Sequence, residues 1–206
     1  MTSYEKLDFW SLKAQKEGYP ARSVYKLMEI DGKFGLFGKV PPKILDLGAA
    51  PGSWSLYILR RFAPAPGGEL RLAAADLQGL SRRFDKGVFD RKDFFFIQGD
   101  LESGPVREAL SGRGPYTVLL SDAAPGTTGN RIVDTGKSLA LAEQVLEYAD
   151  ACLAPGGNMA IKVFQGAGSE DLLERIRERF TAARSFKPKA CRSDSFETYF
   201  LGLGKK

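Results

Sequence analysis

Acidic residues follow four short apolar segments of the sequence, at places where strands would end. The segments cover residues 43–48, 69–75, 94–98 and 116–121, and the acidic residues at or just after them are Asp46, Asp76, Asp100 and Asp122. One such aspartate alone is most often a turn or helix-cap residue. Because ligands of open parallel sheets bind beyond the carboxyl ends of the strands, four of them together indicate a binding site there.

The hydrogen-bond donors that could bind these carboxylates suggest the ligand. Asp76 suits a pair of ribose hydroxyls, Asp100 an exocyclic amine and Asp122 an ammonium group. The loop after the first segment lacks the GxGxxG spacing of a pyrophosphate site and has Pro51 in its turn, which disfavours a dinucleotide. The pattern therefore predicts S-adenosylmethionine as the ligand.

That loop has the sequence Asp46-Leu-Gly-Ala-Ala-Pro-Gly-Ser-Trp54. Gly48 and Gly52 would let the ligand approach the backbone, and a helix from Ser53 would offer free N–H groups. Trp54 fits either a wall of the ligand pocket or a packing position in the core.

Any proton must move through Lys, Asp, Glu, Tyr or water, because the sequence contains no histidine. Mechanisms that need imidazole are thereby excluded. Lys162 lies inside the apolar run Met159-Ala-Ile-Lys-Val-Phe164, where a charge needs a functional reason.

The elements that position these residues alternate between strand and helix. Helices are expected at residues 21–34, 53–62, from 103, 135–152 and 169–180, and strands at 43–48, 69–75, 94–98, 116–121, 158–164, 182–187 and 196–203. Such alternation predicts an α/β fold, a doubly wound, mainly parallel sheet with a hairpin at one edge. We expect one domain over residues 1–206, with a basic helical N-terminal segment (1–40) before a cofactor-binding and catalytic core (41–206).

Six ordered motifs make the sequence resemble the FtsJ/RrmJ (RlmE-type) family of ribosomal RNA ribose 2′-O-methyltransferases over nearly its whole length. They are Ala21-Arg-Ser-Val-Tyr-Lys-Leu27, Asp46-Leu-Gly-Ala-Ala-Pro-Gly-Ser-Trp-Ser55, Ser121-Asp-Ala-Ala-Pro125, Leu153-Ala-Pro-Gly-Gly157, Ile161-Lys-Val-Phe-Gln-Gly166 and Ser195-Phe-Glu-Thr-Tyr199. The chain has Pro-Gly-Ser-Trp where some members have Pro-Gly-Gly-Trp.

The resemblance implies a catalytic tetrad, cofactor contacts and a more specific fold. The tetrad falls on Lys26, Asp122, Lys162 and Glu197, with Lys162 as the proton acceptor. The cofactor contacts fall on Gly52, Trp54, Asp76, Asp100 and Asp122, beside the Gly48 already considered. The implied fold is a Rossmann-like methyltransferase sheet of seven strands, one of them antiparallel.

The chemistry agrees with those assignments. A 2′-oxygen would attack a methyl group that the sulfonium of the cofactor already activates. A lysine can take the proton of that hydroxyl if burial or a nearby cation lowers its pKa from about 10.4. Lys26 would act on Lys162 in that direction, whereas Asp122 and Glu197 would oppose it and fix the ammonium groups.

Charge and aromatic residues favour an RNA substrate. The formal net charge is +5, and the N-terminal segment combines basic with aromatic side chains: Lys6, Lys13, Lys16, Arg22 and Lys33 with Tyr4, Phe9, Trp10 and Tyr19. The family resemblance implies, more specifically, a uridine of 23S rRNA within the large ribosomal subunit. Transfer RNA is the alternative substrate, and a non-catalytic RNA-binding assembly factor is the alternative function.

The remaining expectations concern the setting of the protein. Cys152 and Cys191 lie in unrelated contexts without a CxxC or a histidine, which suggests neither a zinc site nor a disulfide. No apolar run reaches the ~20 residues needed to cross a bilayer. The sequence thus predicts a cytoplasmic monomer without a metal or membrane partner.

Overall fold

The strands of the computed structural model, which describes residues 8–38, 42–192 and 195–206, form one seven-stranded sheet. Its order is β3-β2-β1-β4-β5-β7-β6, and β7 runs antiparallel to both of its neighbours. The other adjacent pairs are parallel. The strands are β1 (Ile44–Leu47), β2 (Leu72–Asp76), β3 (Phe94–Gln98), β4 (Tyr116–Ser121), β5 (Leu153–Phe164), β6 (Phe180–Phe186) and β7 (Glu197–Lys205). The predicted α/β sheet with one antiparallel strand is confirmed.

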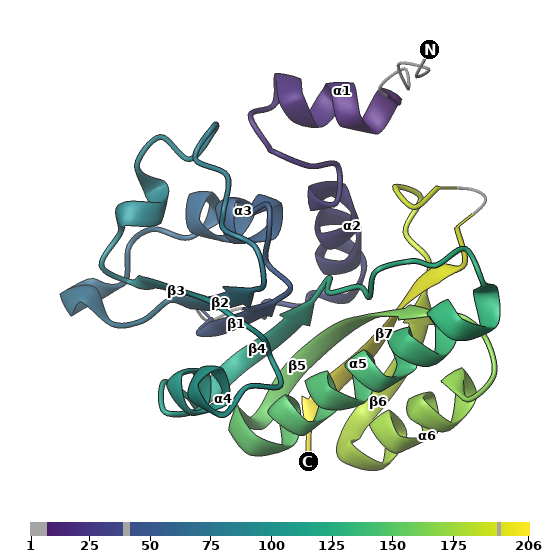
Figure 1. Cartoon of the computed structure of the whole chain (residues 1–206). Coiled ribbons are helices and arrows are strands. Elements are labelled where there is room, and N and C mark those ends of the chain that lie inside the picture. The colour runs from purple at the N-terminus through teal and green to yellow at the C-terminus, as the bar shows by residue number, and fades with distance from the viewer. Residues whose placement is uncertain (1–7, 39–41, 193–194) are drawn as a thin grey trace.

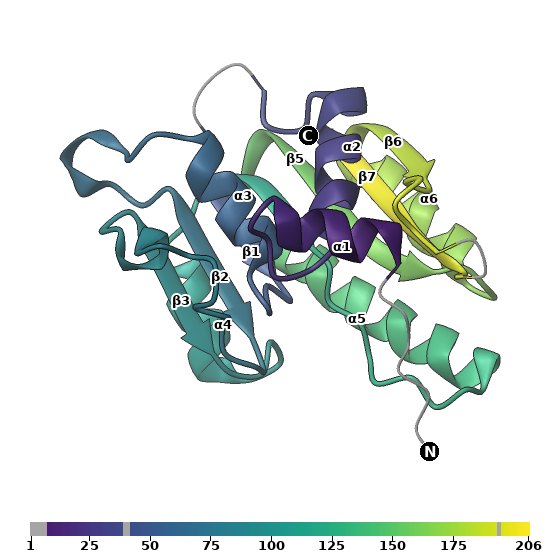
Figure 2. The ribbon, with the colours of Figure 1, turned by 90° about the horizontal axis from the view of Figure 1, so that it is seen from above.

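Helices cover both faces of the sheet (Figure 1). One face carries α4 (Gly104–Ser111), α5 (Arg131–Cys152) and α6 (Ser169–Arg179), and the other carries α2 (Val24–Phe34) and α3 (Ser53–Arg61). α1 (Phe9–Lys16) lies beside α2 above the edge at which the parallel strands end (Figures 1 and 2). Two short 3₁₀ segments are η1 (Pro66–Gly68) and η2 (Val88–Asp90).

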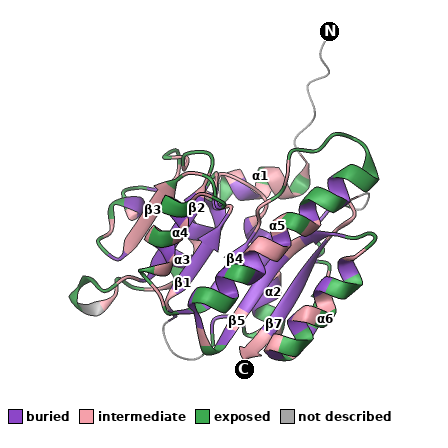
Figure 3. Cartoon of the chain, turned by 60° about the horizontal axis from the view of Figure 1, so that its bottom comes forward, coloured by how far each residue is buried: buried purple, intermediate pink, exposed green. Residues whose placement is uncertain are grey.

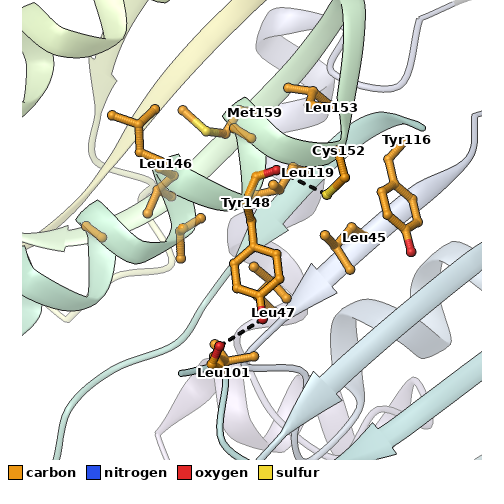
Figure 4. Close-up of a cluster of buried hydrophobic side chains, with 14 of the residues drawn as sticks. Leu45, Leu47, Leu101, Tyr116, Leu119, Leu146, Tyr148, Cys152, Leu153 and Met159 are labelled. Carbon is orange, nitrogen blue, oxygen red and sulfur yellow. Dashed lines mark hydrogen bonds between the residues drawn. The ribbon is translucent and has the colours of Figure 1, made fainter. Parts of the chain in front are cut away.

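The sheet separates two hydrophobic cores, and its central strands are buried between the helices, whose outer surfaces are exposed, whereas the edge strand β3 is half-buried (Figure 3). In the core under α4 to α6, the Tyr148 hydroxyl donates to the Leu101 carbonyl over 2.8 Å and the Cys152 thiol donates to the Tyr148 carbonyl (Figure 4). Met159 and Ile161 of β5 point into this core, whereas Ala160 points into the other. By the same alternation, Lys162 faces the side that α2 covers.

Several predicted boundaries were wrong. The helix expected from residue 135 begins at Arg131, because the Asn130 side chain accepts the N–H groups of Ile132 and Val133 and caps it there. The strand expected from 158 begins at Leu153, since its first residue pairs with Tyr116 across an irregular register. In the N-terminal segment, α1 and α2 are separate helices.

Within the described residues, no helix combines the length and apolar character needed to cross a membrane. The division of the chain at residue 40 stays a prediction. α2 packs on the face of the sheet that also carries α3, and Ala14 of α1 belongs to the same hydrophobic core.

Candidate active site

The ends of three strands bring three of the four tetrad residues together. Lys162 of β5 pairs across the ladder with Tyr199 of β7, so the two side chains share one face of the sheet. Glu197 lies two residues before Tyr199 and therefore points the same way. Asp122 directly follows β4, the other neighbour of β5.

Two ion pairs connect the tetrad. The Nζ of Lys162 lies 3.0 Å from Oδ1 of Asp122 and also donates to the Asp122 carbonyl. Lys26, in the first turn of α2, places its Nζ 2.6 Å from Oε1 of Glu197. All four side chains are largely buried, at 9% to 16% exposure. The predicted tetrad residues thus lie together, from α2, the end of β4, β5 and β7.

Tyr199 links the two pairs, and the sequence analysis gave it no role. Its hydroxyl donates to Oδ1 of Asp122 over 2.6 Å, and the Nζ of Lys26 lies 6.0 Å from its ring centre. The residue is fully buried. Its spacing of two from Glu197 was the available signal, because such residues share a face of a strand.

The pKa shifts at this site favour a cationic Lys26 and anionic Asp122 and Glu197. Burial alone would lower the pKa of Lys26, but the carboxylates of Asp122 and Glu197 outweigh burial and raise it. Burial would raise the pKa of Asp122, yet the ammonium groups of Lys162 and Lys26 hold it below its usual range. Burial would likewise raise the pKa of Glu197, and Lys26 lowers it. Lys26 is therefore a cation and both acids are anions at neutral pH.

Next to the tetrad, a cavity of about 120 Å³ opens at the carboxyl ends of β1, β2, β3 and β4. Its lining residues are Gly48, Asp76, Leu77, Asp100, Leu101, Ala123, Ala124 and Leu141. The backbone N–H groups of Ala50 and Gln78 donate to the Asp76 carboxylate over 2.9 and 2.8 Å and fix its orientation. The Asp100 carboxylate accepts the N–H of Glu102. The lone pairs left on both carboxylates can accept hydrogen bonds from a ligand.

The cavity offers carboxylate acceptors and an apolar surface that suit a nucleoside. Leu77 is 68% exposed beside Asp76, and covering an apolar side chain at such a position with a base is favourable, because its surface is removed from water. Gly48 has φ +76°, and a Cβ there would come within 2.5 Å of the Ala123 backbone, so only glycine lets β1 and β4 approach beneath the cavity. The two carboxylates match the hydrogen-bond donors of S-adenosylmethionine.

Gly52 and Trp54 are not among the residues that line this cavity. A Cβ on Gly52 would lie 2.9 Å from the Phe89 ring, at φ +105°. The Trp54 indole is buried and donates to the Ser23 carbonyl over 2.8 Å, while its ring packs 6.0 Å from that of Tyr199. In this structure Trp54 connects α3 to the start of α2, which carries Lys26.

A second pocket, of about 390 Å³, lies on the α2 side of the tetrad. Its lining residues are Ala21, Arg22, Ser23, Lys26, Arg192, Ser195 and Glu197. Arg22 is held by Asp8 of the α1 cap and donates to the Ala190 carbonyl over 2.6 Å, whereas Arg192 is exposed. The pocket is therefore basic at its mouth and contains the Lys26–Glu197 pair.

The N-terminal basic and aromatic residues are only partly free. Lys13 lies over the rings of Trp10 and Tyr25 and pairs with Glu17 at 3.9 Å, and Tyr19 is buried. Phe9 is exposed. Tyr4 and Lys6 lie outside the described residues.

The fold of this chain is shared with solved methyltransferases. A crystal structure of a ribosomal RNA methyltransferase from Plasmodium falciparum superposes with a TM-score of 0.72 at 24% identity, over 91% of this chain and 98% of that one. A methyltransferase from Burkholderia thailandensis with bound S-adenosylhomocysteine gives a TM-score of 0.57 at 16% identity, over 90% and 78% of the two chains. At such identities the likeness concerns the fold.

The chain belongs to the FtsJ-like methyltransferase family, whose model matches residues 19–205. Three curated relatives carry the name ribosomal RNA large subunit methyltransferase E. The relative from Treponema denticola is 48% identical over 98% of this chain and 97% of its own length. Those from Nitratidesulfovibrio vulgaris and Borrelia duttonii are 44% and 43% identical, each over 96% of this chain and over 94% and 96% of their own lengths. The resemblance inferred from the motifs is confirmed, and the methyl donor of this enzyme is S-adenosylmethionine.

Proposed function

We propose that this enzyme methylates the 2′-hydroxyl of a ribose in RNA, and that its substrate is a uridine of 23S rRNA in the large ribosomal subunit. The relatives named above support the choice of rRNA. The observation that carries the proposal is the paired arrangement of Lys162 with Asp122 and of Lys26 with Glu197 beside a basic pocket. We also propose that it acts as a cytoplasmic monomer.

The tetrad residues take different roles in this proposal. Lys162 accepts the proton of the 2′-hydroxyl as a neutral amine, after its ammonium form has released a proton to solvent, and Asp122 holds the side chain in place through the carboxylate and the carbonyl oxygen. Lys26 stays cationic, because Asp122 and Glu197 raise its pKa, so it stabilises negative charge on the 2′-oxygen. Glu197 fixes the position of Lys26.

The cofactor, when bound, supplies the electrophilic methyl group. Asp76 would accept the ribose hydroxyls, Asp100 the exocyclic amine of adenine and Asp122 the ammonium group. Gly48 shapes the floor of the cavity. The direct contacts expected of Gly52 and Trp54 stay predictions.

A methyl-transfer assay tests this function. Purified protein would be incubated with radiolabelled S-adenosylmethionine and, separately, with large ribosomal subunits, free rRNA and tRNA, and the product nucleosides analysed. Lys162→Ala is expected to lower kcat by about 100-fold or more while cofactor binding persists. Lys92→Ala is the matched control, since Lys92 is exposed just before β3, at the opposite edge of the sheet.

Each outcome of the assay decides between the functions considered. A 2′-O-methylated uridine in subunits or rRNA supports the proposal. Transfer to tRNA alone would make the chain a tRNA methyltransferase. Cofactor binding without transfer to any RNA would overturn the proposal in favour of a non-catalytic assembly factor.

A further inference from the structure

A groove of about 400 Å³ lies between the start of α5 and the segment that follows β5. Its lining residues are Arg131, Ile132, Thr135, Gly136, Gly166 and Ala167. The Gly166 backbone lies close against Thr135. A Cβ at Gly166 would lie 2.4 Å from the Thr135 methyl group, so only glycine fits there. This groove contains none of the cofactor-cavity or tetrad residues.

Apolar side chains are unusually exposed at the groove. Ile132 is 85% exposed and its neighbour Val133 is 41% exposed. A single exposed apolar residue is common on protein surfaces. Next to a hollow, however, covering such a side chain with a flat apolar ligand is favourable, because it removes apolar surface from water.

Gly136 has no structural reason to be glycine. It lies inside α5, and a Cβ built on it would meet nothing within 4 Å. Alanine or leucine would favour the helix at this position. A glycine is expected where a ligand approaches the helix backbone closely.

Arg131 adds a positive charge at one end of the groove. It is the first residue of α5, where the helix dipole favours an anion over a cation. Its guanidinium lies 5.5 Å from the ring centre of Phe196, which holds it in place. Glu170 and Asp171 lie in the first turn of α6, just beyond Ala167. An anionic group in the groove is therefore favoured at the Arg131 end.

The groove and the basic pocket beside the tetrad are separated by residues 195–197. Ser195 and Glu197 line that pocket, whereas Phe196 contacts Arg131 and packs 4.9 Å from Phe164. The segment 195–197 thus contacts the pocket through Ser195 and Glu197 and, through Phe196, the Arg131 end of the groove.

We infer that the groove binds an unpaired nucleotide next to the methylated one in the substrate RNA. The base covers Ile132 and Gly136, and the phosphate lies against Arg131. Proteins that bind single-stranded RNA commonly stack unpaired bases on side chains, above all aromatic rings and Arg guanidinium planes, beside basic residues that contact the phosphates. This inference rests on the proposed function.

Three substitutions test the groove in methyl transfer to large ribosomal subunits that lack the modification. Gly136→Leu should leave thermal stability unchanged or higher while lowering kcat/KM for subunits about tenfold. Gly32→Leu is its control, because Gly32 is also helical and a Cβ built on it would likewise meet nothing within 4 Å. Ile132→Ser should lower kcat/KM about tenfold without changing the salt dependence. Arg131→Ala should reduce the slope of log(kcat/KM) against log salt by about 0.7, as expected for one lost phosphate contact.

Wild-type protein that methylates no RNA would refute the proposed function itself. Wild-type activity together with unaltered kcat/KM in all three variants would overturn the groove inference alone. A photoreactive amino acid in place of Ile132 should crosslink to rRNA. Crosslinking only to a ribosomal protein would also overturn the inference, because the groove would then be a protein-docking surface.

Discussion

Tyr199 occupies the centre of the tetrad, although its hydroxyl does not titrate in the neutral range. Burial and then the carboxylates of Asp122 and Glu197 raise its pKa well above the usual value. The hydroxyl therefore stays protonated and donates to Asp122. This bond orients the carboxylate that also holds Lys162.

Tyr199→Phe keeps the ring against Trp54 and removes only that donor. A hydrogen bond to a charged group contributes about 1.5–3 kcal/mol, so we expect kcat to fall about tenfold or more. The same loss should lower the melting temperature by about 3–12 °C, whereas the Kd of S-adenosylmethionine should change little. Single-turnover kinetics with RNA bound would measure the effect, and an unchanged rate would show that Lys162 and Asp122 align without Tyr199.

Asp46 gives the structure a pH-dependent stability. The side chain is fully buried in β1, accepts the Ser55 hydroxyl over 2.7 Å and leaves Oδ1 without a partner among the described residues. Burial, followed by the charges of Asp122 and Asp76, raises its pKa to about 7 from an ordinary 3.8. The folded protein thus keeps a proton that the unfolded chain releases, so the free energy of unfolding falls as pH rises between those two values.

Asp46→Asn removes this titration while keeping an acceptor for Ser55. We expect the variant and the wild type to melt at similar temperatures near pH 4, and the variant to melt at least about 5 °C higher at pH 8. Calorimetric scans across this range would measure the difference. A constant difference at every pH would mean that Asp46 ionises as readily in the folded protein as in the unfolded chain.

At the scale of elements, the sequence pattern located two short strands at their observed bounds but missed the start of the longest helix. The predicted spans 94–98 and 116–121 agree with β3 and β4 because short apolar runs bounded by turns have few alternative structures. The start of α5 was missed because a side-chain cap, rather than apolar periodicity, fixes it at Asn130.

The same limit applies to the site. Strand-end aspartates could be predicted from topology, because parallel strands bring their carboxyl ends to one edge. The pairing of Lys26 with Glu197 could not, since it depends on how α2 packs against β7, and here the family motifs supplied it. Trp54 illustrates the opposite case, because burial and its bond to Ser23 emerge only from tertiary packing.

One connection between elements positions Glu197. Glu29, one turn after Lys26 on α2, accepts the backbone N–H groups of Lys189 and Ala190 over 2.8 and 2.9 Å. These residues belong to the segment between β6 and β7 that leads to Glu197. The helix that carries one member of the ion pair thereby holds the segment that leads to the other.

Glu29→Ala should release this segment. We expect kcat/KM for RNA to fall about tenfold, because two hydrogen bonds to a charged acceptor are lost, while cofactor affinity stays unchanged. Glu29→Gln, which keeps one acceptor oxygen, should lose less. Equal loss in both variants, or weakened cofactor binding, would contradict a positioning role for Glu29.

On the scale of the whole molecule, opposite charges gather on the two sides of the tetrad. The cofactor cavity contains Asp76 and Asp100, whereas the pocket on the α2 side contains Arg22, Lys26 and Arg192. The formal net charge of +5 adds a general attraction for polyanions. The cationic methyl donor thus faces an acidic cavity, and the anionic RNA faces a basic pocket.

This separation predicts different salt responses for the two ligands. Each phosphate contact contributes about 0.7 to 0.9 to the slope of log affinity against log salt. With a few such contacts, raising salt about fourfold should lower kcat/KM for ribosomal subunits at least about 30-fold. The Kd of S-adenosylmethionine, which makes no phosphate contact, should change about threefold at most. Kinetics and calorimetry over the same salt series would measure both. Equal sensitivity of the two constants would mean that RNA phosphates contribute little to binding, and that recognition depends on shape or on ribosomal protein.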